Sequence, residues 1–119
     1  MAGLKDIPHG ALAIGDILRL PENYDLGPGS GPVDLMVFDP QDSECGLGLL
    51  VISGYKAGLI YARLPLDSLK DGAQALDTGW LTDNWNRWFC YEYGDGMRVI
   101  DIDRVKVLGW DKRIVQELA

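Results

Sequence analysis

The residues of this 119-residue chain that could do chemistry are few and scattered. His9 is the only histidine, and Cys45 and Cys90 are the only cysteines. A Cys90–His9–Asp arrangement would form a nucleophilic centre, because histidine is the commonest general base near neutral pH. Nothing nearby supports it, since Cys90 follows Trp88 and Phe89 on an apolar helical face, where a buried, inert thiol is typical. The sequence therefore predicts no enzyme of this type.

Metal binding has no better support. A structural zinc site needs four ligands at short spacings, which the single histidine and two cysteines do not provide. The run DPQDSE at 39–44 lacks the alternating acidic register and the later glutamate of an EF-hand, so it predicts an acidic turn. Asp101 and Asp103 have no acid or metal partner in the sequence and are interpreted as solvated charges at strand ends. We expect no catalytic residue, no metal and no cofactor.

The glycine-rich run GPGSGP at 27–32 invites comparison with a phosphate-binding loop. It lacks the Gly-Lys-Ser/Thr ending of such loops, and Asp25 and Asp34 flank it with the wrong charge. We interpret it as part of an irregular surface loop over 21–32 that could adapt its shape to a partner.

Charge is distributed very unevenly along the chain. The segment from Pro21 to Gly54 has no Lys or Arg, and nearly all of the net charge of −7 comes from it. Its six acidic residues are Glu22, Asp25, Asp34, Asp39, Asp42 and Glu44. Such a field repels nucleic acid and anionic lipid and attracts a basic protein. We therefore expect a protein partner, and neither nucleic acid nor a membrane.

The composition is that of one globular domain spanning 1–119. Hydrophobic residues make up 47% of the chain and charged residues 24%, which argues against disorder. Two cysteines at long spacing favour reduced thiols. The N-terminal apolar run is broken by Gly15 and Asp16, so it does not predict a signal peptide, and no window is apolar enough to span a membrane. We expect a cytoplasmic location.

The elements that would carry these residues are mostly strands. Alternation of apolar and polar residues predicts a strand over 11–20, and an apolar run predicts another over 33–38. Two more, within 46–55 and 59–65, would form a hairpin whose glycines allow bulges or close backbone approach. The chain is expected to end with strands over 97–102 and 104–108.

Helical signals are fewer. Asp77 or Thr78 is predicted to cap a helix over 80–90, whose shared face holds Leu81, Trp85, Trp88 and Phe89. A single turn after Pro65, capped by Asp67, and a short helix over 111–118, capped by Asp111, are also expected.

The predicted fold class is α+β, mainly β. Short, bent, glycine-rich strands predict a small antiparallel sheet or an SH3-like half-open barrel, with one Trp-rich helix and a short C-terminal helix. If the apolar strand over 33–38 lay at a sheet edge, it would favour a homo-oligomer through that edge.

Four runs of the chain together resemble bacterial polymorphic-toxin immunity proteins. They are GDILRLPENYDLGPGSGP at 15–32, GLGLLVISGYKAGLIYARLP at 46–65, WLTDNWNRWF at 80–89 and IDIDRVKVL at 100–108. The resemblance implies a non-enzymatic inhibitor of a toxin delivered by type VI or contact-dependent secretion and encoded by a neighbouring gene. An acidic inhibitor suits a toxin with a basic cleft, such as a nuclease or a nucleotide-degrading enzyme.

The predicted partner-binding surface combines the acidic segment with two aromatic residues. Exposed Tyr and Trp are common anchors of protein interfaces. The candidate residues are Glu22, Tyr24, Asp25, Asp34, Asp39, Asp42, Glu44 and Trp80. The alternative function is a small barrel adaptor or regulatory module with no toxin partner, and the identity of the neighbouring gene would distinguish the two.

Overall fold

The computed structural model describes residues 2–7, 10–22, 31–54, 56–71 and 73–109. Its largest element is an antiparallel sheet of six strands in the order β1-β10-β3-β4-β5-β6. In chain order these strands are β1 (Ala2–Gly3), β3 (Ile17–Leu20), β4 (Val33–Phe38), β5 (Gly48–Val51), β6 (Ile60–Arg63) and β10 (Lys106–Leu108). The sheet is open, because β1 and β6 do not pair with each other. The predicted mainly-β α+β class is confirmed, and the sheet does not close into a barrel.

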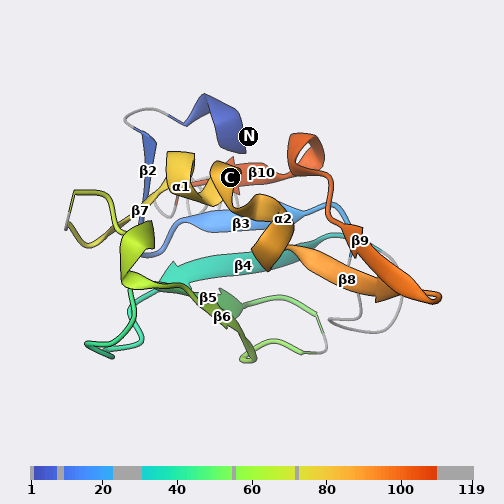
Figure 1. The fold of residues 1–119 in the computed structure, drawn as a ribbon, viewed down its shortest axis with the longest axis horizontal. Coiled ribbons are helices and arrows are strands. Elements are labelled where there is room, and N and C mark those ends of the chain that lie inside the picture. Colours follow the sequence, from blue (N-terminus) through green and yellow to red (C-terminus); the bar gives the residue numbers. More distant parts are fainter. Residues whose placement is uncertain (1, 8–9, 23–30, 55, 72, 110–119) are drawn as a thin grey trace, which may run out of the picture.

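Two small sheets and several short helices complete the described fold. Strand β2 (Ala11–Ala13) pairs with β7 (Ala75–Asp77), and β8 (Cys90–Tyr93) pairs with β9 (Gly96–Val99). The helices are η1 (Leu4–Asp6), η3 (Leu66–Ser68), α1 (Thr78–Asp83), α2 (Trp85–Trp88) and η4 (Ile102–Arg104). Helices α1 and α2 lie over one face of the large sheet, and the β8–β9 hairpin projects at one end of the molecule (Figure 1).

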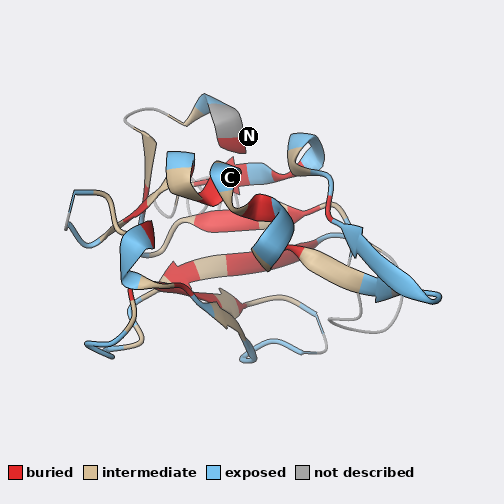
Figure 2. Ribbon diagram, in the orientation of Figure 1, coloured by how far each residue is buried: buried red, intermediate tan, exposed pale blue. Residues whose placement is uncertain are grey.

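The core lies between this sheet face and the helices. Leu18 and Val51 both lie opposite Leu35 on neighbouring strands, and all three are fully buried. Trp85 and Phe89 join the same core cluster from the helical side. Figure 2 shows the result, with β3 and β4 largely buried and β9 exposed. Burial of one face explains why short apolar runs were sufficient to specify these strands.

The predicted strand over 33–38 and the predicted hairpin are confirmed. Strand β4 has the expected bounds, and β5 pairs with β6 through a register shift between Leu49 and Leu50. A Cβ atom on Gly48 would lie 2.6 Å from the Phe38 ring, and one on Gly46 would lie 2.9 Å from the Pro65 carbonyl oxygen. These two glycines therefore permit close packing, as the sequence indicated.

The prediction of one strand over 11–20 is wrong. The segment forms β2 and β3, which belong to different sheets. Gly15, at a φ of 96°, lies in the turn between them, and the Ala13 backbone N–H donates to the Asp16 carboxylate at 2.8 Å. A left-handed glycine and a local side-chain acceptor form a tight turn where the apolar pattern alone suggested a continuous strand.

The prediction of one helix over 80–90 is also wrong in extent. Asp77 caps α1 as predicted, accepting hydrogen bonds from the backbone N–H groups of Gly79 and Trp80. The helix ends at Asn84, whose side-chain amide donates to the Trp80 carbonyl at 2.9 Å, and α2 follows as a separate turn. Asparagine bonds of this kind satisfy the carbonyl groups at a helix end, so the helix stops there. Cys90 already belongs to β8.

The remaining expectations have mixed outcomes. The helical turn after Pro65 is confirmed as η3, but Asp67 lies inside it and does not cap it. Strand β9 ends at Val99, and η4 precedes β10, so the two predicted C-terminal strands were too long. Strand β4 is paired on both sides and is not an edge, which removes the expected route to a homo-oligomer. The predicted helix over 111–118 and its Asp111 cap lie outside the described residues.

Candidate partner-binding surface

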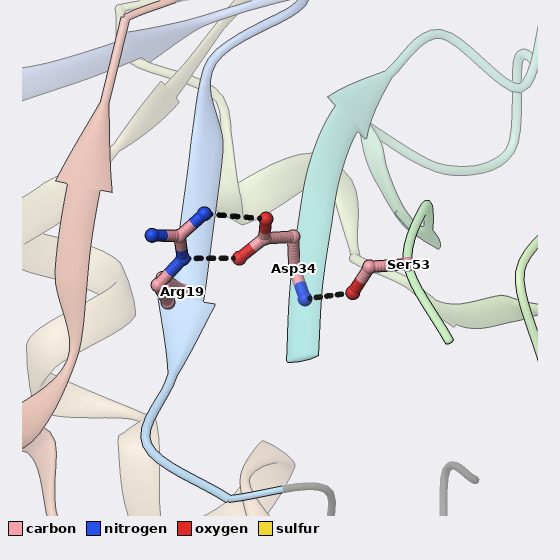
Figure 3. A network of polar contacts seen from close by, with 3 residues as sticks. All are labelled: Arg19, Asp34 and Ser53. Carbon is pink, nitrogen blue, oxygen red and sulfur yellow. Dashed lines mark hydrogen bonds and ion pairs between the residues drawn. The ribbon is translucent and has the colours of Figure 1, made fainter. Parts of the chain in front are cut away.

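Among the described acidic residues of the predicted surface, Asp34 is the one that lies inside the protein. Its carboxylate accepts two hydrogen bonds from Arg19, Nε to Oδ1 at 2.8 Å and Nη2 to Oδ2 at 2.9 Å (Figure 3). The Asp34 side chain is 7% exposed and that of Arg19 is 34% exposed. The Asp34 backbone N–H donates to the Ser53 hydroxyl at 2.8 Å. Asp34 therefore joins β3, β4 and the segment after β5, and its carboxylate is not presented to a partner.

Three other carboxylates are exposed together on the connection between β4 and β5. They belong to Asp39, Asp42 and Glu44. Asp39 Oδ1 accepts the Gln41 backbone N–H at 2.8 Å, and Asp42 Oδ1 accepts the Glu44 backbone N–H at 2.9 Å. Such bonds between an aspartate and the backbone two residues later fix the local turn. We call residues 39–44 the acidic loop.

The strand register separates this loop from the beginning of the acidic segment. Leu20, the last residue of β3, lies opposite Val33, the first residue of β4. Glu22 is exposed just beyond that end, whereas Asp39 follows the other end of β4. A six-residue strand spans about 17 Å at roughly 3.4 Å per residue. The described acids therefore do not form one patch; Tyr24 and Asp25 lie outside the described residues.

Trp80 lies between core and surface. It is half-buried on α1, and its ring centroid lies 6.3 Å from that of Trp88 at an interplanar angle of 50°. Both rings pack against the core cluster. Part of the predicted aromatic anchor is therefore used in holding the helices to the sheet.

The other helical aromatics have structural roles. Trp85 stacks on Phe89, with ring centroids 3.8 Å apart, and its indole N–H donates to the Ile100 carbonyl at 2.6 Å. Tyr61 stacks on Phe89 and donates its hydroxyl to the Trp88 carbonyl at 3.1 Å. Burial, with a smaller effect from Cys90, raises the pKa of Tyr61 to about 12. Trp85 and Phe89 are both buried in the core cluster, and Trp88 packs against it while remaining half-buried.

The residues whose side chains could take part in catalysis or metal binding do not come together in the described fold. Cys45 and Cys90 are free and half-buried. Partial burial and the nearby Asp42 carboxylate raise the pKa of the Cys45 thiol, which favours its protonated form. Asp101 caps η4 by accepting the Asp103 backbone N–H. His9 is outside the described residues, and no three potential ligands gather around a metal position among the residues that are described.

Sequence reasoning missed the exposed apolar side chains of β9. Met97 and Val99 on β9 are 60% and 45% exposed. The sequence signal was the turn Gly94-Asp95-Gly96, which predicted a reversal of chain direction. It did not show that the following strand would lie outside the six-stranded sheet.

Comparison with known proteins identifies the family. The family model described as Immunity protein 45 matches residues 4–100, which is most of the chain. The chain belongs to this immunity protein family. Neither the curated proteins nor the solved structures gave a match. The predicted resemblance is confirmed, and the match favours immunity over the adaptor alternative.

Immunity proteins of polymorphic toxin systems bind a cognate toxin, so the general function of the chain is immunity. In the described part of this Immunity protein 45 member, no helix has the length and apolar character needed to cross a bilayer. Exposed features of the described residues include the acidic loop, Glu22 and strand β9, and Trp80 is partly exposed.

Proposed function

We propose that this Immunity protein 45 member neutralises a toxin whose contact surface is basic, and that the acidic loop accelerates their association. The observation that supports this most directly is the exposure of Asp39, Asp42 and Glu44 on one short connection with fixed turns. The whole chain carries a net charge of −7, which attracts a basic partner from a distance. Complementary charge raises association rates more than it slows dissociation.

Fast association with the toxin has a functional advantage for an immunity protein. A toxin that enters the cytoplasm must be bound before it reaches its target, so the association rate matters as much as final affinity. A nuclease or a nucleotide-degrading enzyme has a basic cleft for its phosphates, and an acidic inhibitor matches that cleft. We therefore propose such a toxin, acting in the cytoplasm, as the partner.

The test uses the toxin domain encoded by the neighbouring gene, carrying an inactivating substitution, and surface plasmon resonance over a series of salt concentrations. The loop variant is Asp39→Asn/Asp42→Asn, which removes two charges while keeping the Oδ1 acceptors of both turns. The matched control is Asp6→Asn/Asp83→Asn, which removes two exposed charges elsewhere. We expect the loop variant to associate more slowly and with a weaker salt dependence than the control.

The possible outcomes test separately the contribution of the acidic loop, the identity of the partner and the class of toxin. Equal slowing by both variants would assign the effect to total charge and remove the acidic loop from the proposal. Absence of binding by the unmodified chain would contradict the proposed partner. A toxin domain that binds but degrades neither nucleic acid nor nucleotides would contradict the proposed toxin class and leave the binding surface unaffected.

A further inference from the structure

The β8–β9 hairpin is a separate two-stranded sheet that projects from the body. Strands β8 and β9 pair only with each other in the described fold. The hairpin occupies one end of the long axis, and the acidic loop lies at the opposite end (Figure 1). All four residues of β9 are exposed, which Figure 2 shows as a continuous exposed strand.

The base of the hairpin is firmly held although its tip is not covered. Phe89 and Ile100, which flank the two strands, are buried, and the Ile100 N–H donates to the Phe89 carbonyl at 2.8 Å. The Trp85 indole donates to the Ile100 carbonyl at 2.6 Å. An isolated two-stranded hairpin is marginally stable in water, so this anchorage is what orders it. An ordered, projecting element loses little conformational freedom when it binds.

One face of the hairpin carries two exposed apolar side chains. Met97 and Val99 are two residues apart on β9 and therefore share a face. Opposite them on β8 lie Glu92 and the half-buried Cys90. Exposed apolar side chains gathered on one strand mark interaction surfaces more often than isolated ones do. Methionine in particular adapts its shape to a binding partner.

Charge at the tip indicates the kind of partner. Glu92, Asp95 and Met97 line one shallow hollow together with Gly94 and Gly96. A lysine or arginine side chain suits such a hollow, because its aliphatic stem can contact methionine while its charged end reaches a carboxylate. A second copy of this chain would bring the same carboxylates and a second charge of −7 against the first, which disfavours self-association.

We propose that the β8–β9 hairpin is the apolar contact element for the toxin, with Met97 and Val99 buried in the complex and a toxin Lys or Arg side chain in the hollow beside Glu92 and Asp95. This inference rests on the proposed function, which supplies the basic partner. In this proposal, the two ends of the molecule affect different rate constants of toxin binding. The acidic loop sets mainly the association rate, and the hairpin sets mainly the dissociation rate.

The test is Met97→Thr/Val99→Thr, which removes apolar contact while keeping residues that favour strands. The control is Leu59→Thr, because Leu59 is 48% exposed in the β5–β6 connection. With the inactivated toxin domain, we expect the hairpin variant to dissociate roughly tenfold faster, since buried apolar anchors dominate interface energetics. Its association rate should remain that of the unmodified chain, and so should its urea unfolding midpoint. The control should keep both rates.

Each contrary result has its own meaning. If the toxin binds and the hairpin variant dissociates like the unmodified chain, the hairpin is not a contact and the proposed function is unaffected. If the unmodified chain binds no toxin, the proposed function itself fails. If the unmodified chain is a dimer in sedimentation and Met97→Thr/Val99→Thr makes it a monomer, the hairpin is an interface between copies and the inference is overturned.

Discussion

At the scale of single residues, the Arg19–Asp34 pair shows how burial changes the meaning of a carboxylate. Asp34 and Asp39 both lie in the acidic segment, five residues apart, but one is 5% exposed and the other lies on the surface. Register decides this difference, because Arg19 lies directly opposite Asp34 across β3 and β4. A carboxylate that accepts two hydrogen bonds from one guanidinium contributes to the stability of the fold. An exposed carboxylate contributes instead to the electrostatic field around the protein.

Asp34→Asn should therefore destabilise the fold and Asp39→Asn should not. The asparagine side chain cannot accept both hydrogen bonds from Arg19, and it leaves the guanidinium without its countercharge. We expect this to lower the free energy of unfolding by about 1–3 kcal/mol. Asp39→Asn keeps the turn acceptor and should change that free energy by less than about 0.5 kcal/mol. Urea unfolding of the two variants measures both values. Equal midpoints would show that the pair contributes nothing beyond an exposed charge.

Tyr61 gives a pH-dependent prediction. Its neutral phenol is stabilised by burial, so the folded-state pKa of about 12 exceeds the ordinary value of 10. A raised pKa means that this stabilisation is complete below about pH 10 and is lost as pH rises toward about 12. The unfolding free energy of the unmodified chain should fall over that interval more steeply than that of Tyr61→Phe. Urea unfolding at about pH 8 and about pH 11 tests this, and parallel losses in both proteins would contradict it.

At the scale of elements, the close contact between the segment before β5 and the residues that flank η3 depends on a missing side chain. Gly46→Ala would place a Cβ atom 2.9 Å from the Pro65 carbonyl oxygen and 3.2 Å from Leu69. Backbone must move to relieve such a contact, so we expect a loss of about 1–3 kcal/mol in unfolding free energy. Gly96→Ala on β9 is the control, because nothing lies within 4 Å of its Cβ position. If both variants melt at the same temperature, the Gly46 contact is not tight.

The elements that the sequence predicted best are those whose signals are local. Strand β4 is a mostly apolar run, interrupted by Asp34, between Pro32 and Pro40. The α1 cap at Asp77 follows from residue type and position. The break at Asn84 and the turn at Gly15 were missed because each depends on a side chain bonding to a backbone group, Asn84 to Trp80 and Asp16 to Ala13. Such bonds compete with regular structure and leave the apolar periodicity unchanged.

The candidate surface was harder to predict than the fold because it depends on pairing between distant segments. The acidic segment is continuous in sequence, yet Glu22 and Asp39 lie at opposite ends of the paired strands β3 and β4. The exposure of Met97 depends on β9 pairing with β8 alone, which the sequence does not state. The family resemblance held because it rested on several runs of the chain and not on the placement of any single residue.

At the scale of the whole molecule, the acidic loop lies at one end and the β8–β9 hairpin at the other (Figure 1). This arrangement favours the proposed binding mode, in which charge and apolar contact act separately. Electrostatic attraction is screened beyond about 8–10 Å at physiological ionic strength. The molecule extends 39 Å, so the proposal requires the toxin to pass close to the loop as well as to the hairpin. In the proposed complex, the net charge of −7 first attracts the basic toxin, and burial of apolar area then holds it.

This separation predicts additive effects. The variant combining Asp39→Asn/Asp42→Asn with Met97→Thr/Val99→Thr should show the slow association of the first and the fast dissociation of the second. Because the two pairs share no contacts, their effects on binding free energy should sum to within about 0.5 kcal/mol. Surface plasmon resonance of the four proteins with one toxin preparation completes this double-variant cycle. A coupling larger than about 1 kcal/mol would mean that loop and hairpin bind one connected region of the toxin, so that charge and contact would act together and not in sequence.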